Sequence, residues 1–120
     1  MSEAEPQFLY LTTTGRATGL PREIEIWFTA LDGRYYLISE LRERAQWVRN
    51  IIRDPRVSFR AGADGATVGG RARVVRDDAE PALAATVKAR SDAKYGWSDG
   101  LLVEVTPGGE SDAAARDPVP

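Results

Sequence analysis

The 120-residue sequence contains no cysteine and no histidine. Without cysteine there is no disulfide, no thiolate metal ligand and no thiol nucleophile. Without histidine the chain also lacks the commonest metal ligand and the usual general base near neutral pH. If the protein is an enzyme, we therefore expect a bound organic cofactor to supply its chemistry, and we expect no metal site.

Long apolar runs are absent as well. No run approaches the roughly 20 apolar residues that cross a bilayer, and the start of the chain, Met1 to Pro6, is acidic and polar, unlike a secretory leader. We expect a cytoplasmic protein without an integral membrane segment. The length fits one domain, which we place at residues 1–106. The Gly-, Ala-, Asp- and Pro-rich residues 107–120 are expected to form a disordered tail.

Lysine is scarce, since only Lys88 and Lys94 accompany the arginines among the 16 basic residues. The planar guanidinium group of arginine binds phosphate and carboxylate groups through two hydrogen bonds more readily than the ammonium group of lysine does. A biased genome would produce the same excess, so the count alone decides nothing. The net charge of −2 and the pI of about 5.2 argue against bulk affinity for nucleic acid.

Alternating apolar residues predict a domain rich in β-strands. Ile24, Ile26 and Phe28 share one face of an expected strand, and Asp32-Gly33 predicts a hairpin turn after it. We expect the first three strands to form an antiparallel meander, because tight turns join them. The six expected strands are Phe8–Thr13, Arg22–Ala30, Arg34–Ser39, Val57–Ala61, Ala66–Val75 and Leu101–Thr106.

A helix is expected from about Arg42 to Asp54. Trp47, Val48, Ile51 and Ile52 recur at helical spacing, so they would form one apolar stripe. The proline after Asp54 ends this helix, because a residue before proline is pushed out of the helical region.

A second helix is expected after Asp77 or Asp78, which would cap it, and it would run to about Ala93. Within the preceding strand, Gly69-Gly70 predicts a bulge or a sharp bend. Six short strands and two helices predict a mainly β, α+β fold: a small six-stranded antiparallel barrel with the helices packed on its outside.

The segment from Thr12 to Arg22 is rich in hydroxyls and holds two glycines and two arginines. Glycine lets backbone N–H groups approach a ligand closely, and guanidinium groups suit an anion such as phosphate. A tight hairpin with solvated arginines is an equally good interpretation. The spacing of a Walker loop is missing.

Two motifs carry a family resemblance. The string Leu-Thr-Thr-Thr-Gly-Arg-Ala-Thr-Gly-Leu-Pro-Arg ends at Arg22, and Trp47-Val-Arg-Asn50 is followed by Asp54-Pro-Arg-Val57. Together they resemble the deazaflavin-dependent nitroreductases, over about Phe8 to Val75. The resemblance implies a split β-barrel related to flavin-binding pyridoxamine-phosphate oxidases. It also implies that reduced coenzyme F420, a 5-deazaflavin, passes a hydride to nitroaromatics, quinones or other unsaturated acceptors.

The resemblance assigns a cofactor site residue by residue. The basic residues for the phosphate and acidic tail match Arg16 and Arg22. Two departures leave open whether flavin mononucleotide (FMN) binds instead: Ala17 and Glu40 stand where relatives often carry lysine. The remaining matched positions are Thr14 and Gly15 in the same loop, Ile26 and Trp27 along the ring, Ser39 at a strand end, and Gln46, Trp47 and Asn50 on the helix over the ring.

The residues themselves allow both functional and structural interpretations of this site. Trp47 and Asn50 share a helix face, where they would stack and hydrogen-bond a flat heterocycle, or anchor the helix in the core. Trp27 points away from the inward face of its strand, toward solvent, a partner or a ring site. Tyr95 and Trp97 would line an acceptor pocket or pack locally under the last strand. Tyr95, or a water, is our candidate proton donor.

Other functions stay open at this point. An FMN-dependent reductase or a non-catalytic module that binds a cofactor or lipid would use the same barrel. A single-stranded nucleic-acid barrel would stack bases on Tyr10, Tyr35 and Tyr36, but the acidic pI argues against it. Because Trp27 and Tyr35 are expected to face outward, we also predict a homodimer that buries them. The physiological partner would be a small-molecule acceptor.

Overall fold

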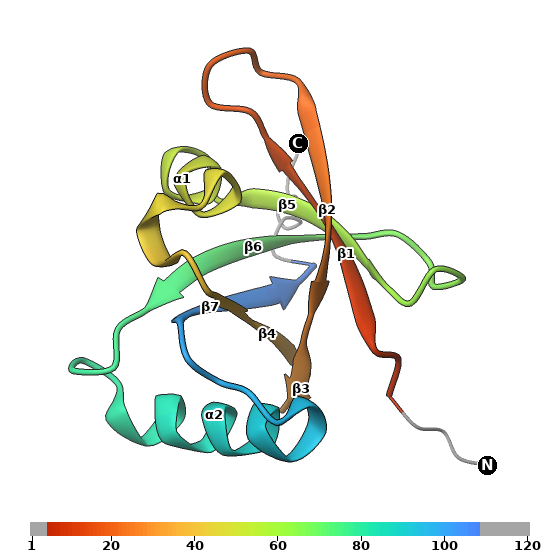
Figure 1. Cartoon of the computed structure of the whole chain (residues 1–120). Helices are drawn as coiled ribbons and strands as arrows, with labels where there is room; N and C mark the ends of the chain where they lie inside the picture. Colours follow the sequence, from red (N-terminus) through yellow and green to blue (C-terminus); the bar gives the residue numbers. More distant parts are fainter. Residues whose placement is uncertain (1–4, 109–120) are drawn as a thin grey trace.

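The computed structural model of the chain describes residues 5–108. Within this range the strands form one antiparallel sheet in the order β2-β1-β5-β6-β7-β4-β3 (Figure 1). The elements are β1 (Phe8–Thr14), β2 (Pro21–Trp27), β3 (Thr29–Leu31), β4 (Arg34–Ser39), a 3-10 turn η1 (Arg42–Arg44), α1 (Gln46–Arg53), β5 (Arg56–Ala61), β6 (Val68–Val75), α2 (Pro81–Tyr95) and β7 (Leu101–Pro107). The described part of the chain has no helix both long and apolar enough to cross a membrane.

The predicted mainly β, α+β class with antiparallel strands and two α-helices is confirmed, but the prediction of six strands in a barrel was wrong, because the described residues form seven strands in an open sheet. The single strand expected over Arg22–Ala30 breaks at Phe28 into β2 and β3, which lie at opposite edges of the sheet. At the break, the Phe28 N–H donates to the Tyr95 hydroxyl (3.1 Å), and the Phe28 carbonyl accepts from Lys94 Nζ (2.8 Å). Since α2 satisfies this peptide, the strand need not continue. The expected meander is therefore split in two at this point.

The hairpin between β3 and β4 was predicted correctly. Asp32 and Gly33 have φ of 54° and 77°, the left-handed pair of a type I′ turn. Leu31 pairs with Arg34 directly across this turn. The Asp-Gly dipeptide thus fixes the register of the edge hairpin through local chemistry alone.

The bulge predicted at Gly69-Gly70 is absent, since the pairing of β6 with β5 runs through both glycines without a break. Gly70 has another reason to lack a side chain. A Cβ there would lie 2.5 Å from the Thr106 carbonyl oxygen on β7. The glycine therefore permits close packing of two backbones.

The first α-helix is shorter than predicted. Arg42–Arg44 forms a 3-10 turn, and Ala45 is extended, with φ of −66° and ψ of 138°, so α1 begins only at Gln46. Val48 and Ile51 are buried as expected, but Ile52 is 57% exposed and lies outside the apolar stripe.

The second α-helix starts later than predicted. Neither Asp77 nor Asp78 caps it, because the cap position is Glu80, which makes no side-chain capping bond. Pro81 occupies the first turn, where its missing N–H costs nothing. The helix ends at Tyr95, and of the expected disordered tail only the last residue of β7 and Gly108 lie within the described residues.

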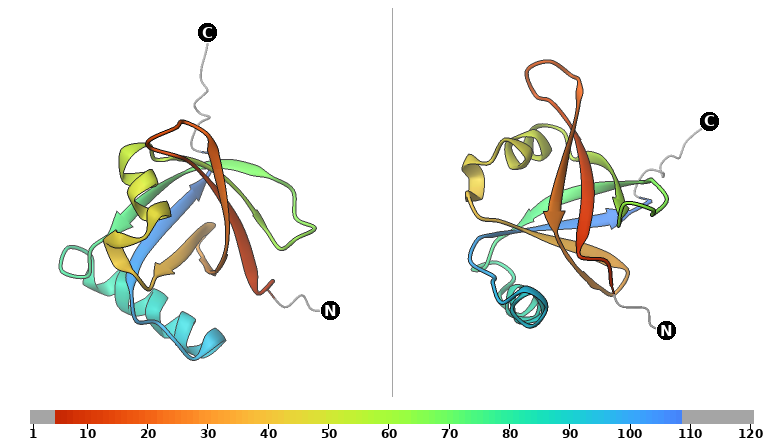
Figure 2. Two further views of the ribbon diagram at one scale, coloured as in Figure 1. Left: turned by 45° about the horizontal axis from the view of Figure 1, so that its top comes forward. Right: turned by 45° about the vertical axis from the view of Figure 1, so that its right-hand side comes forward.

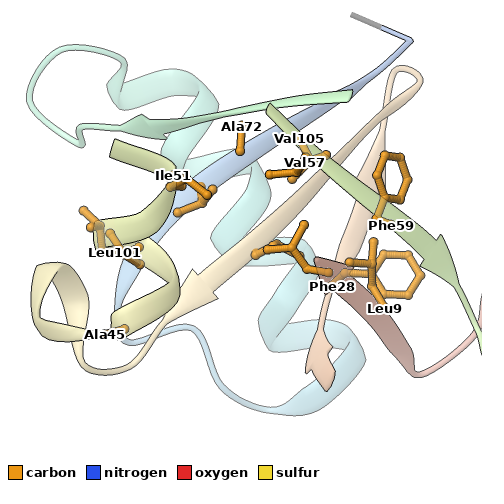
Figure 3. Packing of buried hydrophobic residues seen from close by; sticks show 13 residues of the cluster. Leu9, Phe28, Ala45, Ile51, Val57, Phe59, Ala72, Leu101 and Val105 are labelled. Atoms are coloured by element: carbon orange, nitrogen blue, oxygen red, sulfur yellow. The ribbon is translucent and has the colours of Figure 1, made fainter. Parts of the chain in front are cut away.

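Buried side chains form one cluster on each face of the sheet. Leu37 and Val103 join the cluster under α1, while Ile38 and Leu102 join the cluster under α2, so β4 and β7 are buried on both faces. Figure 2 shows β7 between the two helices, and Figure 3 shows side chains from α1 and the strands meeting in the first cluster. Each fully buried leucine or valine stabilises the fold by roughly 1.5–3 kcal/mol, which gives the site below a rigid support.

Candidate functional site

The β1–β2 hairpin projects beyond the sheet and lies beside α1 (Figure 1). Its loop is ordered by its own backbone: the Gly15 N–H donates to the Leu20 carbonyl (2.8 Å) and the Gly19 N–H to the Gly15 carbonyl (2.7 Å). The Leu20 N–H donates to Thr18 Oγ1 (3.2 Å). The segment singled out in the sequence is therefore a defined loop at the tip of a hairpin.

Asn50 joins this hairpin to α1. Its side chain is only 4% exposed, and Nδ2 donates to the buried Thr13 hydroxyl (3.0 Å). Oδ1 accepts from the Arg16 backbone N–H (3.2 Å) and from Arg16 Nη1 (3.0 Å). The amide uses both its donor and its acceptor ends, so it fixes the distance between hairpin and helix.

Replacement of Asn50 by alanine is expected to lower the free energy of unfolding by about 1–3 kcal/mol, because Thr13 loses its buried partner. Urea denaturation measures this change. Arg53→Ala, at an exposed position on the same helix, serves as the control and should cost less than about 0.5 kcal/mol. An equal cost in both variants would show that the buried amide does not join the two elements.

Arg16 is held against α1 by further contacts. Nη2 donates to Gln46 Oε1 (2.7 Å), and Nη1 lies 3.5 Å from the Gln46 carbonyl oxygen. Arg22 is exposed and forms no ion pair with another described residue. One guanidinium is thus fixed in place, and the second is available to an anion.

A cavity of about 480 Å³ lies between the hairpin and α1, and we call it the hairpin cavity. Its one large aromatic residue is Trp47, which is partly buried against the core. Its charged residues are two arginines and Glu23, whose carboxylate pairs with Arg60 (2.7 Å). The cavity is lined by Gly15, Arg16, Ala17, Thr18, Arg22, Glu23, Ile24, Gln46, Trp47 and Asn50.

A second cavity, of about 590 Å³, contains all three tryptophans of the sequence, and we call it the tryptophan cavity. Trp47 lines both this cavity and the hairpin cavity. The rest of the lining is mostly apolar, with two carboxylates and one hydroxyl. The cavity is lined by Phe8, Glu25, Ile26, Trp27, Ile38, Ser39, Glu40, Leu41, Trp47 and Trp97.

The end of β4 forms one wall of the tryptophan cavity. Ser39 is 2% exposed, and its hydroxyl donates to the Arg42 carbonyl (3.0 Å). Arg42 itself has φ of 55°, which a non-glycine residue adopts only with some strain. The Ser39 hydroxyl therefore holds the chain as it turns from β4 into η1, next to the cavity.

Tyr95 lies behind Trp27. The two rings stack with centroids 4.3 Å apart and 6° between their planes, and Trp97 meets Trp27 edge-on at 6.3 Å. The Tyr95 hydroxyl accepts from the Phe28 N–H and donates to the Gln7 carbonyl (2.6 Å), with the Phe28 carbonyl at 2.9 Å. Tyr95 lines neither cavity, so its hydroxyl is placed on backbone groups and away from the space where an acceptor would bind.

Two outward positions expected from the pattern differ in the structure. Tyr35 was predicted to face outward, but it packs against the core and contacts the rings of Phe28 and Phe59. Tyr36 is 3% exposed, so it offers no stacking surface to a nucleic-acid base. Both changes follow from the burial of β4 on both faces.

The structure brings most of the predicted site residues together. Nine of the ten predicted cofactor residues line at least one of the two cavities; Thr14 instead lines two further hollows with Arg56, one of which also includes Gly15 and Arg16. The sequence reasoning missed the contributions of Phe8, Glu25 and Leu41. For Glu25 a signal existed, because it is two residues from Trp27 on the same strand and so shares its outward face.

The pKa of Tyr10 is raised above its ordinary value, first because its hydroxyl donates to the Glu25 carboxylate (2.8 Å). This contact holds the Glu25 side chain on the outward face of β2. Arg60 lies over the Tyr10 ring, 4.4 Å from its centroid. The rim of the tryptophan cavity on β2 is thus an ordered polar surface.

Solved structures with a similar arrangement of strands show which fold this is. The haem storage protein HutZ from Vibrio cholerae is similar at a TM-score of 0.69 and 22% identity, over 86% of this chain and 82% of that one. A conserved hypothetical protein from Mycobacterium tuberculosis is similar at 0.69 and 24%, over 89% and 81%. An FAD-binding protein from Mesorhizobium loti is similar at 0.63 and 16%, over 84% and 80%. The fold is that of the split-barrel, FMN-binding-like proteins.

The family follows from the sequence. The F420H(2)-dependent quinone reductase family matches residues 2–100, and the chain belongs to it. This confirms the resemblance to deazaflavin-dependent reductases that the two motifs indicated. A search of curated proteins gave no significant match.

Proposed function

We propose that this protein reduces an electron-poor small molecule, a quinone, nitroaromatic or enone, with a hydride from reduced coenzyme F420. The observation that carries the proposal is that Trp47 lines both cavities. The hairpin cavity is lined by arginine and the tryptophan cavity by aromatic side chains. A ligand with an anionic end and a flat ring would place the anionic end in the first and the ring in the second. The family supports a deazaflavin in this role.

The residues present fit such a cofactor. Arg22 and the fixed guanidinium of Arg16 would hold its phosphate in the hairpin cavity, since both line that space. The indoles of Trp27 and Trp47 would contact the ring, and Ile26 would pack beside it. When bound, the reduced deazaflavin supplies a hydride from C5 to the acceptor. The chain itself contributes orientation and a site from which water is partly excluded.

We infer that Tyr95 positions Trp27 and does not donate the proton. Tyr95→Phe keeps the ring stack, so kcat/KM should stay within about threefold of the wild type, whereas Tyr95→Ala should raise KM about tenfold because Trp27 loses its support. Steady-state kinetics measure both. A fall of about 100-fold or more in kcat for Tyr95→Phe is the size expected for loss of a general acid, and it would restore the role first predicted for this hydroxyl.

Two alternatives keep the same fold. An FMN-dependent reductase is compatible with the similarity to an FAD-binding protein, and a non-catalytic binding module is compatible with the similarity to a haem storage protein. Purified protein that carries yellow flavin would favour the first. Tight cofactor binding without reduction of any acceptor would favour the second. The homodimer and the cytoplasmic location stay predictions, and the dimer now rests on Trp27 without Tyr35.

The proposal is tested by turnover. The protein is mixed with reduced F420 and a neutral quinone, and the oxidised deazaflavin is followed by its absorbance, with reduced FMN and NADPH in parallel reactions. We expect that, of the three reductants, only reduced F420 is oxidised in a reaction that requires both the protein and the quinone. Turnover with FMN or NADPH but not with F420 would replace the proposal by the flavin alternative.

A further inference from the structure

Among residues 5–108, the charged residues that line the tryptophan cavity are all acidic. Glu25 comes from β2 and Glu40 directly follows β4, so the two carboxylates reach the same cavity from different parts of the sheet. Both residues are exposed. No lysine or arginine in the described part of the chain lines the cavity. An entering acceptor therefore meets negative charge without a compensating cation in the lining.

Two arginines related to these carboxylates by sequence or by a shared contact pair with other residues. Arg42, close to Glu40 in sequence, pairs with Asp99 (3.0 Å). Arg60, which lies over the Tyr10 ring, pairs with Glu23 (2.7 Å). The carboxylate partners of these two guanidinium groups are therefore Asp99 and Glu23, and neither group forms an ion pair with Glu25 or Glu40 among the described residues.

The two cavities, which share Trp47 as a lining residue, thus differ in charge. The hairpin cavity holds Arg16 and Arg22, and the tryptophan cavity holds Glu25 and Glu40. An anionic group is attracted to the first and repelled from the second. This polarity gives a ligand with one anionic end a single favoured direction, and it leaves the acidic end for the second reactant.

From this arrangement we propose that Glu25 and Glu40 are specificity residues, which admit neutral and cationic aromatic acceptors to the tryptophan cavity and discriminate against anionic ones. The inference rests on the proposed function only in treating the bound aromatic molecule as the acceptor of the hydride. The charge selection itself is a property of the cavity, and binding to the protein alone measures it. The three tryptophans of the chain all line this cavity, so their fluorescence reports occupancy directly.

The probes are three nitrobenzenes that differ in charge: 4-nitrobenzyltrimethylammonium, 4-nitrobenzyl alcohol and 4-nitrobenzoate. Quenching of tryptophan fluorescence gives a Kd for each at low salt, without cofactor, and kcat/KM is then measured with reduced F420. We expect the anion to bind about tenfold more weakly than the cation. In Glu25→Gln/Glu40→Gln the ratio should fall to about threefold or less. The control Asp64→Asn/Asp92→Asn changes net charge equally, at exposed residues outside both cavities, and should keep the wild-type ratio.

Equal affinities for the three probes in the wild type, or an equal change in the control, would overturn the inference. The two proposals fail separately. If the probes bind according to their charge but none is reduced by F420, the proposed function is contradicted, whereas the charge selection by Glu25 and Glu40 is supported. Reduction of all three probes with equal kcat/KM and equal Kd would leave the proposed function standing and remove the role of Glu25 and Glu40. High salt should shrink the wild-type ratio.

Discussion

Replacement of Arg73 by methionine is expected to lower the free energy of unfolding by about 2–3 kcal/mol, since it leaves a buried carboxylate without its cation. Glu104 is 5% exposed and accepts from Arg73 Nε (2.8 Å) and from the Tyr36 hydroxyl (2.8 Å). Arg73 also reaches Glu80 (2.7 Å). The arginine is half exposed, so we place the cost below the full value for a buried ion pair.

The same cluster gives the stability a pH dependence. Burial alone would raise the pKa of Glu104, but the hydrogen bonds from Arg73 and Tyr36 outweigh it and lower the pKa below the ordinary 4.5. The Arg73 hydrogen bond also lowers the pKa of Glu80. A depressed pKa in the folded state contributes stability above the unfolded pKa, and that stability is lost as the pH falls through the folded value. We therefore expect unfolding to become easier below about pH 4.5.

For Tyr36 the pH dependence of stability has the opposite sign, and it falls in the alkaline range. Burial, and then its hydrogen bond to Glu104, raise the pKa of Tyr36 to about 12. A raised pKa contributes stability that is complete below the unfolded value of 10.0 and is lost as the pH rises toward 12.

Urea denaturation at several pH values tests the cluster, with Arg60→Met as the matched control. Arg60 pairs with Glu23 at the surface, so its loss should cost less than about 1 kcal/mol. Glu104→Gln should flatten the acid limb of the pH profile. If Arg73→Met costs no more than Arg60→Met, the buried carboxylate does not depend on its arginine.

The second large effect is expected on cofactor affinity. Trp47→Leu keeps apolar bulk against the core but removes the flat indole that lines both cavities, so F420 should bind about 10–100-fold more weakly. Arg22→Ala removes the unpaired guanidinium of the hairpin cavity, and about a tenfold loss is expected. Fluorescence of the deazaflavin during titration measures both.

Controls separate binding from folding in this experiment. Arg90→Ala removes the same charge from an exposed position on α2, outside both cavities, and should leave the Kd unchanged. The free energy of unfolding of Arg22→Ala should lie within about 0.5 kcal/mol of the wild-type value, because the Arg22 side chain is exposed. Wild-type affinity in both Trp47→Leu and Arg22→Ala would remove the site assignment.

Local patterns in the sequence predicted the features that depend on neighbouring residues. The Asp32-Gly33 turn needs only two residues with positive φ, and it formed as expected. The break at Phe28 could not be predicted in this way, because Tyr95 and Lys94 satisfy its peptide from the far end of α2. One break at that point separates β2 from β3 and opens the sheet.

In the candidate site too, local spacing predicted some features, whereas others depend on residues distant in the sequence. Trp47 and Asn50 share a helix face, and the spacing alone placed them together. The use of the Asn50 amide to hold the hairpin was not readable, since its partners Thr13 and Arg16 are more than 30 residues away in sequence. The convergence of Glu25 and Glu40 likewise depends on which strands become neighbours of the cavity.

The most direct test of the account is an equilibrium titration of the wild-type protein with F420 and, separately, with FMN, followed by tryptophan and deazaflavin fluorescence. We expect saturable binding of F420 at one site per chain, weaker binding of FMN, and loss of the F420 signal in Trp47→Leu. Tighter binding of FMN than of F420, or F420 binding that ignores the loss of this indole, would contradict it.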